Sequence, residues 1–512
     1  MTSVAAPSTL VEISDSVVGV LANSPQHLLI GGEWLPANSG AVMDVVNPAN
    51  GELLTRVAKA DETDAERVVD AASGAFENPA WRWMPANERG RLLYRMAELV
   101  AERAADIAQA ETLNVGKPLF QAEDDVETVV DCFRYYAGAA RLLKGATPAV
   151  PTDFFSYTLH EPIGVCVGIV PWNFPFQITA WKVAPALAAG NTVILKPASR
   201  TPLSALILGQ IGLEAGLPPG VLNVVTGPGA LIGQALASHP AVGKISLTGE
   251  TRTGEKIMQL AARGIKRLSL ELGGKSPSLI FPDADLDQAV TASLTAIYFN
   301  AGQMCAARSR IIVHEDIHRE FVGMMADRAR RLRLGNPMDR ATHMGPMISQ
   351  DQVETVESFV ESGLKEGATL LAGGCRPDDP ELQQGHFYMP TIFDNVKNDM
   401  RIAREEIFGP VASVIPFRTE EEAVRLANET SYGLAATIWT GDVKRAHRVA
   451  RQIRAGGVWI NTNMTLFNET PFGGYKASGM GRELGLESLL SYTEVKHVGV
   501  FLGERVRGFN LG

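Results

Sequence analysis

Hydrophobic and polar residues follow two different patterns along this chain of 512 residues. Between residues 61 and 140, apolar residues recur every three to four positions with polar residues between them, which predicts a series of packed amphipathic helices. Between residues 163 and 270, short apolar runs alternate with helical patterns. Buried strands that alternate with helices predict a parallel sheet covered by helices on both faces.

The second half of the chain repeats this alternation less regularly. Apolar runs at 278–281, 414–417, 436–439 and 457–460 predict strands of a second α/β lobe. Residues 147–159 break the pattern and predict an extended segment outside the main core. The tail, 492–500, alternates like an edge strand, and we expect it to pair with residues 154–159 of a neighbouring subunit.

Composition narrows the class of protein. With 46% apolar and 20% charged residues, the chain is typical of soluble globular proteins, and its length exceeds what one hydrophobic core supports. A net charge of −10 gives no electrostatic footprint for nucleic acid or an anionic membrane surface, and no apolar run is long enough to span a membrane.

The cysteines and the first residues indicate the compartment. Cys132, Cys166, Cys305 and Cys375 show no paired spacing of a zinc site or a disulfide framework, which favours reduced thiols in a cytoplasm and predicts no metal. Residues 1–25 contain no Lys or Arg, so we expect a loose leader and neither a secretory signal nor a transit peptide.

One cysteine is a candidate nucleophile. Cys305 lies in a loop between a predicted helix and the strand at 311–313, and Gly302 in the same loop lets backbone approach a substrate closely. A lone intracellular cysteine is as readily a buried, inert thiol. A nucleophile needs a base and an anion site, and the loop itself displays neither.

Two other loops offer those groups. Glu271 ends an apolar strand just before two glycines, where burial would raise its carboxyl pKa and prepare it as a general base. Asn173 lies in a strand-to-helix turn, where its amide would donate to an oxyanion. The alternatives are a surface acid or a partner of Lys275 for Glu271, and a helix cap for Asn173.

Two glycine-containing turns are candidates for a dinucleotide site. Gly229 and Gly233 belong to a glycine-rich turn after one strand, and Thr248, Gly249 and Glu250 form a turn after the next strand. Each precedes a predicted helix whose first N–H groups would face a pyrophosphate. A glycine turn alone is weak evidence, because it also serves as a tight strand-to-helix connection.

The end of another strand bears on the choice of coenzyme. Lys196 and Ser199 place a cation and a hydroxyl where an adenine ribose would lie. A carboxylate at this place would repel a 2′-phosphate, whereas Ser199 does not, and Arg200 follows it. We therefore expect NADP to be accepted as well as NAD.

Five motifs together resemble the aldehyde dehydrogenase superfamily over residues 27–500. They are 171–175 (PWNFP), 270–277 (LELGGKSP), 299–308 (FNAGQMCAAR), 406–410 (EIFGP) and 471–474 (PFGG). Several independent matches are far more specific than one. The usual glutamate of the family's Lys-Pro-x-Glu motif is Ser199 here, and this departure argues against a strict preference for NAD.

The resemblance implies the aldehyde dehydrogenase fold: α/β, with a Rossmann-like coenzyme domain, an α/β catalytic domain and a small β oligomerisation element, assembled as a homodimer or homotetramer. We expect the flexible leader at 1–25, the coenzyme domain at 26–140 and 162–273, the catalytic domain at 274–489, and the oligomerisation element at 141–161 and 490–512.

The resemblance also implies roles for individual residues. Cys305 attacks the aldehyde, Asn173 and the Cys305 N–H hold the oxyanion, hydride passes to NAD or NADP, and Glu271 activates water to hydrolyse the thioester. Lys182 and Glu483 match positions that support proton movement. The residues that match coenzyme-binding positions are Pro171, Trp172, Lys196, Ser199, Gly229, Gly233, Thr248, Gly249, Glu250, Leu272, Glu406 and Phe408.

The positions that match a substrate tunnel are Phe174, Ile178, Trp181, Leu466 and Phe472, which suggest an apolar or aromatic aldehyde. Asp125 and Glu127 near its mouth would favour an amino-aldehyde, but a helix surface explains them better. Three rival functions remain: a non-catalytic coenzyme-binding relative, a thiol hydrolase, and an acyl-CoA-forming enzyme.

Overall fold

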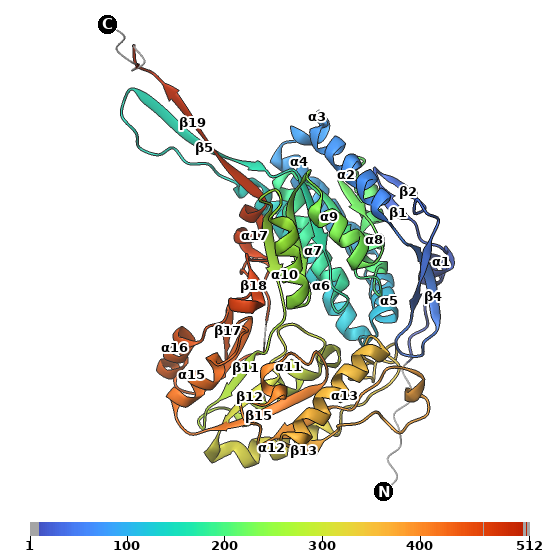
Figure 1. The fold of residues 1–512 in the computed structure, drawn as a ribbon, viewed down its shortest axis with the longest axis vertical. Coiled ribbons are helices and arrows are strands. Elements are labelled where there is room, and N and C mark those ends of the chain that lie inside the picture. The colour runs from blue at the N-terminus through green and yellow to red at the C-terminus, as the bar shows by residue number, and fades with distance from the viewer. Residues whose placement is uncertain (1–9, 464, 505–507, 509–512) are drawn as a thin grey trace.

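The computed structural model describes residues 10–463, 465–504 and 508. Two α/β lobes lie one above the other, and a two-stranded arm projects from the upper lobe (Figure 1). Each lobe is built on its own sheet. The two α/β lobes predicted from the alternation of strands and helices are therefore present.

The upper lobe contains an eight-stranded sheet with the order β18-β10-β9-β6-β7-β8-β1-β2. Its five central strands are parallel, so their carboxyl ends meet at one edge. The strands are β1 (Leu28–Ile30), β2 (Glu33–Leu35), β6 (Val165–Ile169), β7 (Thr192–Lys196), β8 (Leu222–Val224), β9 (Val242–Thr248), β10 (Arg267–Glu271) and β18 (Gly479–Met480).

Helices cover both faces of this sheet, as the apolar strands require. One face carries α2 (Glu62–Glu77), α9 (Gln234–Ser238) and α10 (Thr251–Ala261). The other carries α4 (Ala86–Glu102), α5 (Ala104–Val115), α6 (Leu119–Ala139), α7 (Pro175–Ala189) and α8 (Leu203–Glu214). Short helices α3 (Pro79–Arg82) and η1 (Ala140–Leu142) continue these layers.

The lower lobe contains a seven-stranded sheet with the order β13-β14-β15-β12-β11-β16-β17. Its strands are β11 (Pro277–Ile280), β12 (Arg310–His314), β13 (Thr369–Ala372), β14 (Thr391–Asp394), β15 (Val411–Phe417), β16 (Ala435–Trp439) and β17 (Gly457–Ile460). Its helices are α11 (Leu286–Tyr298), α12 (Glu315–Ala329), α13 (Gln350–Lys365), α14 (Arg401–Arg404), α15 (Glu420–Asn428), α16 (Val443–Gln452) and the 3₁₀ turns η3 (Phe299–Gly302), η4 (Leu382–Gln384) and η5 (Lys476–Ser478).

The projecting arm joins β5 (Phe154–Pro162) to β19 (Thr493–Phe501) in antiparallel register, from Thr493 opposite Pro162 to Phe501 opposite Phe154. The expectation that the tail strand pairs with a neighbouring subunit is wrong for this pairing, because both strands belong to one chain. β5 and β19 both extend from the upper lobe, so the strand edge nearest to β19 is that of β5 in the same chain.

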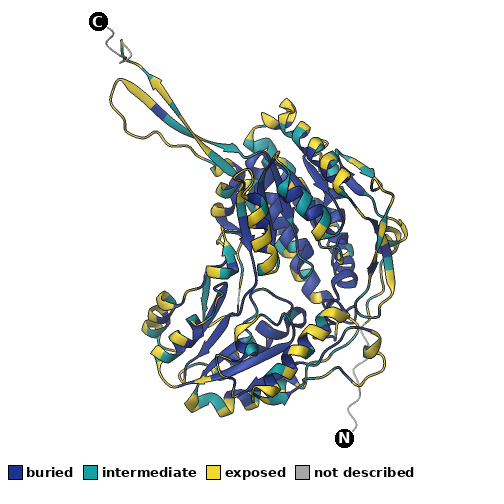
Figure 2. Cartoon of the chain, viewed as in Figure 1, coloured by how far each residue is buried: buried dark blue, intermediate teal, exposed yellow. Residues whose placement is uncertain are grey.

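The arm is mostly exposed, whereas the strands inside the lobes are buried (Figure 2). Phe154, Phe155 and Val495 are 46%, 47% and 63% exposed. Exposed apolar side chains gathered on one projecting element are typical of a surface that contacts a partner.

Helix α1 (Asp15–Ala22) lies within the stretch where the sequence suggests a loose leader. Ser14 caps it by accepting a hydrogen bond from the backbone of Val17, and Val17 is buried against the upper lobe. Residues 1–9 of the expected leader lie outside the described residues. A short helix of this kind is stabilised by its tertiary contacts, which a local pattern does not reveal. Strands β3 (Val42–Val46) and β4 (Leu53–Ala58) pair beside it.

The C-terminal segment returns to the upper lobe. β18 lies antiparallel to β10, with Met480 opposite Leu270 and Gly479 opposite Glu271. Helix α17 (Gly485–Ser491) packs against α7, and Phe472, Leu484 and Leu489 join the core of the upper lobe. Within the segment that we expected in the catalytic domain, Phe472, Leu484 and Leu489 therefore join the upper core, while Tyr475 and Ala477 bond to the lower-lobe loop at 431–433.

Candidate active site

The loops that carry the candidate residues meet between the two lobes. Asn173 follows β6, Lys196 ends β7, Thr248 ends β9 and Glu271 ends β10. Because these strands are parallel neighbours, their ends share one edge of the sheet. Cys305 reaches the same place from the lower lobe, in the loop between η3 and β12.

The loop before Cys305 has an unusual backbone. Asn300 and Ala301 adopt left-handed conformations, with φ of 47° and 53°, and Gly302 follows with φ of 76°. A Cβ at Gly302 would lie 2.1 Å from the carbonyl oxygen of Gly409, so only glycine fits there. The loop is therefore held against the segment that contains Glu406 and Phe408.

Asn173 is buried and its amide is held in place. Its Nδ2 donates to the carbonyl oxygen of Gln303 at 2.9 Å, and Asn300 Nδ2 donates to the Asn173 carbonyl oxygen at 2.9 Å. A primary amide carries two N–H donors, so one remains beside the Cys305 loop for an oxyanion. The helix-cap alternative does not hold, because no side chain caps α7.

Glu271 is 2% exposed, and no hydrogen bond of ordinary geometry from a described residue reaches its carboxylate oxygens. Burial raises its pKa to about 7, while the nearby Cys305 thiol and Lys182 act in the opposite direction. A carboxyl group with this pKa accepts and returns a proton near neutral pH. The surface-acid alternative does not hold.

Cys305 is half-buried. Burial raises the pKa of its thiol well above the ordinary value, and Glu271 raises it further. The strand end that carries Glu271 touches the cysteine loop, since a Cβ at Gly274 would lie 2.5 Å from the Cys305 carbonyl oxygen. The thiol thus depends on a nearby proton acceptor to ionise.

A buried ion pair lies behind Glu271. Lys182 Nζ donates to Glu483 Oε1 at 2.8 Å, to Thr248 Oγ1 at 2.9 Å and to Ser246 Oγ at 3.0 Å. Ser246 Oγ also donates to Glu483 Oε1 at 2.8 Å. Lys182 lowers the pKa of Glu271 and Glu483 raises it, so the pair is electrostatically coupled to the candidate base.

Glu406 and Phe408 lie at the junction of the lobes. Glu406 Oε1 accepts a hydrogen bond from the Gly274 N–H at 3.0 Å, and burial raises the pKa of this carboxyl to about 8. Phe408 packs edge to face against Trp172, with 5.1 Å between ring centres. Both predicted coenzyme residues thus border the loops of Glu271 and Asn173.

Lys196 is the residue most suited to a coenzyme hydroxyl or phosphate. It is 4% exposed, no described residue accepts a hydrogen bond from its Nζ, and burial lowers its pKa to about 8. The turn with Gly229 and Gly233 passes over it, as a Cβ at either glycine would lie within 3.9 Å of its side chain. A buried cation without an acceptor fits a ligand rich in oxygen.

Ser199 lies beside this lysine and donates to the Gly227 carbonyl oxygen at 2.9 Å. The Arg200 side chain turns to Asp351, 2.7 Å away. The turn at 229–233 is a π-helical turn that leads into α9, so the helix predicted after this glycine-rich turn begins irregularly.

The remaining predicted coenzyme residues lie along the same edge. Gly249 N–H donates to the Glu271 carbonyl oxygen, Glu250 is exposed at the N-terminus of α10, and no side chain caps that helix. Leu272 N–H donates to the Ser478 carbonyl oxygen. Pro171 is half-buried at the start of the Asn173 turn.

The predicted tunnel residues form an aromatic wall. Phe174 stacks on Phe299 at 6.2 Å, and Trp181 contacts Phe472 edge to face at 5.7 Å. Ile178 is buried beside them and Leu466 is half-buried against the same core. In each pair one ring belongs to the start or body of α7, namely Phe174 and Trp181. The other ring, Phe299 or Phe472, belongs to a segment that packs against that helix.

Asp125 is not a surface acid. It is 3% exposed and forms a buried ion pair with Lys117, and burial raises its pKa to about 6. Its charge is therefore not available to a cationic aldehyde. Glu127 lies on the exposed side of α6.

Several contributing residues were missed by sequence reasoning. Gln303 and Asn300 stand inside the cysteine motif, yet their roles arise from bonds to Asn173 across the chain. Ser246 was missed as well, because it accepts a hydrogen bond from Lys182 only through the packing of β9 near α7. Thr248 was predicted as a coenzyme residue, and its bond to Lys182 is an additional contact.

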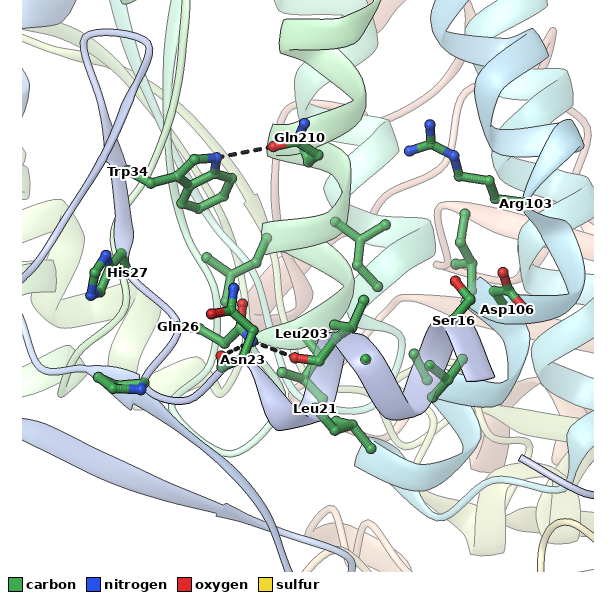
Figure 3. A pocket seen from close by; sticks show the side chains of 18 residues that line it. Ser16, Leu21, Asn23, Gln26, His27, Trp34, Arg103, Asp106, Leu203 and Gln210 are labelled. Carbon is green, nitrogen blue, oxygen red and sulfur yellow. Dashed lines mark hydrogen bonds between the residues drawn. The ribbon is translucent and has the colours of Figure 1, made fainter. Parts of the chain in front are cut away.

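Two further features lie apart from this site. Figure 3 shows a pocket of about 590 Å³ between α1, α5 and α8, with Trp34 bonded to Gln210 at one end and Asp106 at the other; none of the predicted site residues lines it. In the described part of the chain, no set of three His, Cys, Asp or Glu residues is placed to hold a metal ion, and no helix is long and apolar enough to cross a membrane.

Comparison with known proteins finds relatives over nearly the whole chain. Over its full matched length, the chain is 46% identical to betaine aldehyde dehydrogenase of Bacillus subtilis, across 92% of this chain and 97% of that protein. It is 47% identical to human retinal dehydrogenase 2, across 93% of this chain and 92% of that protein.

Solved structures show the same fold. The NAD+ complex of an aldehyde dehydrogenase from Bacillus cereus superposes with a TM-score of 0.95 at 43% identity, covering 97% of this chain and all of that one. Residues 34–498 match the model of the aldehyde dehydrogenase family. With the cysteine loop, the buried glutamate and the asparagine turn at one sheet edge, the chain belongs to the aldehyde dehydrogenase family.

Proposed function

We propose that, in this NAD(P)-dependent aldehyde dehydrogenase, Cys305 is the nucleophile, Glu271 the general base and Asn173 the oxyanion donor. The observation that carries the proposal is that the buried Glu271 ends a strand whose continuation touches the Cys305 loop, where a Cβ at Gly274 would lie 2.5 Å from the Cys305 carbonyl oxygen. At this contact Glu271 raises the pKa of the Cys305 thiol. Asn173, fixed through Gln303, belongs to the same loop cluster.

The first half of the reaction forms a carbon–sulfur bond. Cys305 Sγ attacks the aldehyde carbon after losing its proton, and Glu271, with a pKa of about 7, is the nearest acceptor suited to take it. The aldehyde oxygen becomes an oxyanion that accepts hydrogen bonds from Asn173 Nδ2 and the Cys305 N–H. When bound, the nicotinamide supplies the hydride acceptor.

The second half releases the acid. Loss of hydride from the carbon leaves a thioester on Cys305. Glu271 first passes the proton it took from Cys305 to solvent. It then removes a proton from water, the water oxygen attacks the thioester carbon, and Asn173 again stabilises the oxyanion. The carbon–sulfur bond breaks, the acid leaves and the Cys305 thiolate is restored. The neighbouring Lys182 lowers the pKa of Glu271, and Glu483 raises it.

The coenzyme site fits NAD and NADP. Lys196 supplies a buried cation whose Nζ donates to no described residue, and the uncapped N-terminus of α10 supplies free N–H groups. Glu406 and Phe408 border the nicotinamide end. Ser199 places no carboxylate near the ribose, which supports acceptance of NADP. The Bacillus cereus relative binds NAD+.

The aromatic wall of Phe174, Trp181 and Phe472 supports an apolar or aromatic aldehyde. The relatives include a betaine aldehyde dehydrogenase and a retinal dehydrogenase at nearly equal identity, so resemblance does not choose between a cationic and an apolar substrate. The pairing of Asp125 with Lys117 weakens the case for an amino-aldehyde.

One experiment tests the proposal. NADH and NADPH formation is measured by absorbance with short aliphatic, aromatic and ω-amino aldehydes. Cys305→Ser should abolish formation with every aldehyde, whereas Cys375→Ser, at an exposed cysteine, should leave it unchanged. Full activity of Cys305→Ser would refute the assignment of the nucleophile.

We also propose that the enzyme is a homodimer or homotetramer of the cytoplasm. The apolar side chains exposed on the β5–β19 arm support self-association. The four cysteines are free, which is consistent with a reducing compartment.

A further inference from the structure

The start of helix α6 and the loop before it reach the cysteine loop and Phe174, although no part of this helix carries a predicted catalytic residue. Gln121 is 1% exposed, and its Oε1 accepts a hydrogen bond from the Asn300 N–H at 3.0 Å. This N–H belongs to the left-handed turn before Cys305. Gln121 therefore fixes a residue in a left-handed conformation that residues other than glycine seldom adopt and that asparagine adopts more readily than most.

Asn300 passes this constraint to Asn173. Its Nδ2 donates to the Asn173 carbonyl oxygen at 2.9 Å, and its carbonyl oxygen accepts from Gln303 Nε2 at 3.0 Å. Gln303 in turn holds the Asn173 amide through its carbonyl oxygen. A rotation of Asn300 would thus move the main chain and the side chain of Asn173 together.

A second contact fixes the other side of the turn. Lys117 Nζ lies 4.3 Å from the centre of the Phe174 ring, on a fully buried side chain paired with Asp125 and Glu111. Glu111 Oε1 also lies 3.4 Å from the Phe176 N–H, which donates to it. Because Phe299 stacks along Phe174, that ring is confined by neighbours from both lobes.

We propose that Gln121 is a positioning residue that sets Asn173 for the oxyanion, while the buried Lys117–Asp125 pair confines the neighbouring Phe174. Gln121 does not touch the reacting atoms; it acts through Asn300. The inference rests on the proposed role of Asn173, and it adds that the geometry of this donor is set from α6. A side chain displaced by about 1 Å costs about 100-fold in rate, so the contact matters for activity.

The test compares Gln121→Met in two backgrounds. In the otherwise unchanged enzyme, Gln121→Met should lower kcat/KM by about 10- to 100-fold. In the Asn173→Ala enzyme, where the side-chain amide that Gln121 positions is absent, the same substitution should change kcat/KM by less than about 2-fold, since effects routed through one residue are not additive.

Gln109→Met is the matched control. Gln109 is also a buried glutamine on a helix of the same layer, but it bonds to the backbone of Ser14 and Glu12, away from the site. It should leave kcat/KM within about 2-fold. The pH dependence of turnover, which reports Glu271, should be the same in Gln121→Met and the unchanged enzyme.

The outcomes separate the two proposals. If Gln121→Met lowers kcat/KM equally in both backgrounds, Gln121 has only a structural role and the inference is wrong. If Asn173→Ala is fully active, the proposed function of Asn173 fails first. Should Gln121→Met not fold, Gln121→Asn keeps the amide but shortens its reach and gives the same comparison. A second pair of variants tests the contact with Phe174: Lys117→Arg should retain activity, and Lys117→Met should lower it.

Discussion

Lys182 Nζ and Glu483 Oε1 lie 2.8 Å apart inside the protein, although 301 positions separate them in the sequence. Both side chains are almost fully buried, and Glu483 comes from the segment that returns to the upper lobe. A buried pair of this kind is costly to break, because removal of one partner leaves the other charge uncompensated.

Opposite shifts of the pH profile are expected when either partner is neutralised. Lys182 lowers the pKa of Glu271 and Glu483 raises it. Lys182→Gln should therefore raise the pKa of Glu271 above about 7 and move the acidic limb of kcat to higher pH. Glu483→Gln should move that limb to lower pH. Steady-state rates measured between pH 5 and 9 would show the acidic limb of each variant. A shift of this limb in the same direction in both variants would contradict the electrostatic coupling.

The pKa of Glu271 determines how turnover depends on pH on the acidic side of the profile. Its pKa is about 7 and the base must be ionised, so turnover should fall as pH drops through 7, by about tenfold for each unit well below it. Glu271→Gln should slow both halves of the reaction and most of all the hydrolysis of the thioester. Mass spectrometry of the intact enzyme after mixing with aldehyde and NAD would detect acylated Cys305; an unacylated enzyme with normal turnover would contradict the role.

Ser199→Glu should narrow the choice of coenzyme. A carboxylate at this place repels the 2′-phosphate of NADP, so kcat/KM for NADP should fall by about tenfold or more, equivalent to about 1.4 kcal/mol, while the value for NAD is kept or improved. The control is Ser199→Ala, which removes the bond to Gly227 without adding charge. Equal losses for both coenzymes in Ser199→Glu would show that residue 199 does not face the ribose.

Gly302→Ala should disable the cysteine loop. The new Cβ would meet the Gly409 carbonyl oxygen at 2.1 Å, so the loop must move, and kcat should fall by at least about tenfold. Gly367→Ala is the matched control, since Gly367 also has positive φ, at 91°, but no atom within 4 Å of the added Cβ. It should cost about 1 kcal/mol of unfolding free energy without changing kcat. Thermal melts of both variants report the backbone strain that the new side chain causes, and kcat reports the displacement of the cysteine loop.

The projecting arm gives a prediction about assembly. Phe155→Ser combined with Val495→Ser removes two exposed apolar side chains from it and should shift the protein to a smaller species in light scattering after size exclusion. Trp83→Ser, at a side chain 74% exposed on another surface, is the control and should leave the mass unchanged. An unchanged mass in the arm variant would show that these residues do not form the contact.

Much of the site could be predicted because its residues end parallel strands. Asn173, Lys196, Thr248 and Glu271 each follow an apolar run, and neighbouring parallel strands necessarily deliver their ends to one edge. Cys305 was identified by the motif around it. The family, the α/β fold and the aldehyde dehydrogenase activity inferred from these motifs are confirmed by the comparisons.

What the sequence did not reveal depends on contacts between distant segments. Asp125 reads as a surface acid on its helix, and only the loop before α6 brings Lys117 to it. Strand β18 has two residues, too few for any periodicity, yet it extends the sheet next to Glu271. Helix α1 has a capping serine but only eight residues, so its formation depends on the surface that Val17 covers.

The position of β18 has a consequence for biosynthesis. The ribosome makes the polypeptide from its N-terminus, and domains generally fold in that order. The strand that pairs with Leu270 and Glu271, and the acid that neutralises Lys182, both lie near the end of the chain. A nascent polypeptide therefore carries its thiol before the surroundings of its base are complete, and the enzyme gains reactivity only when translation is almost finished.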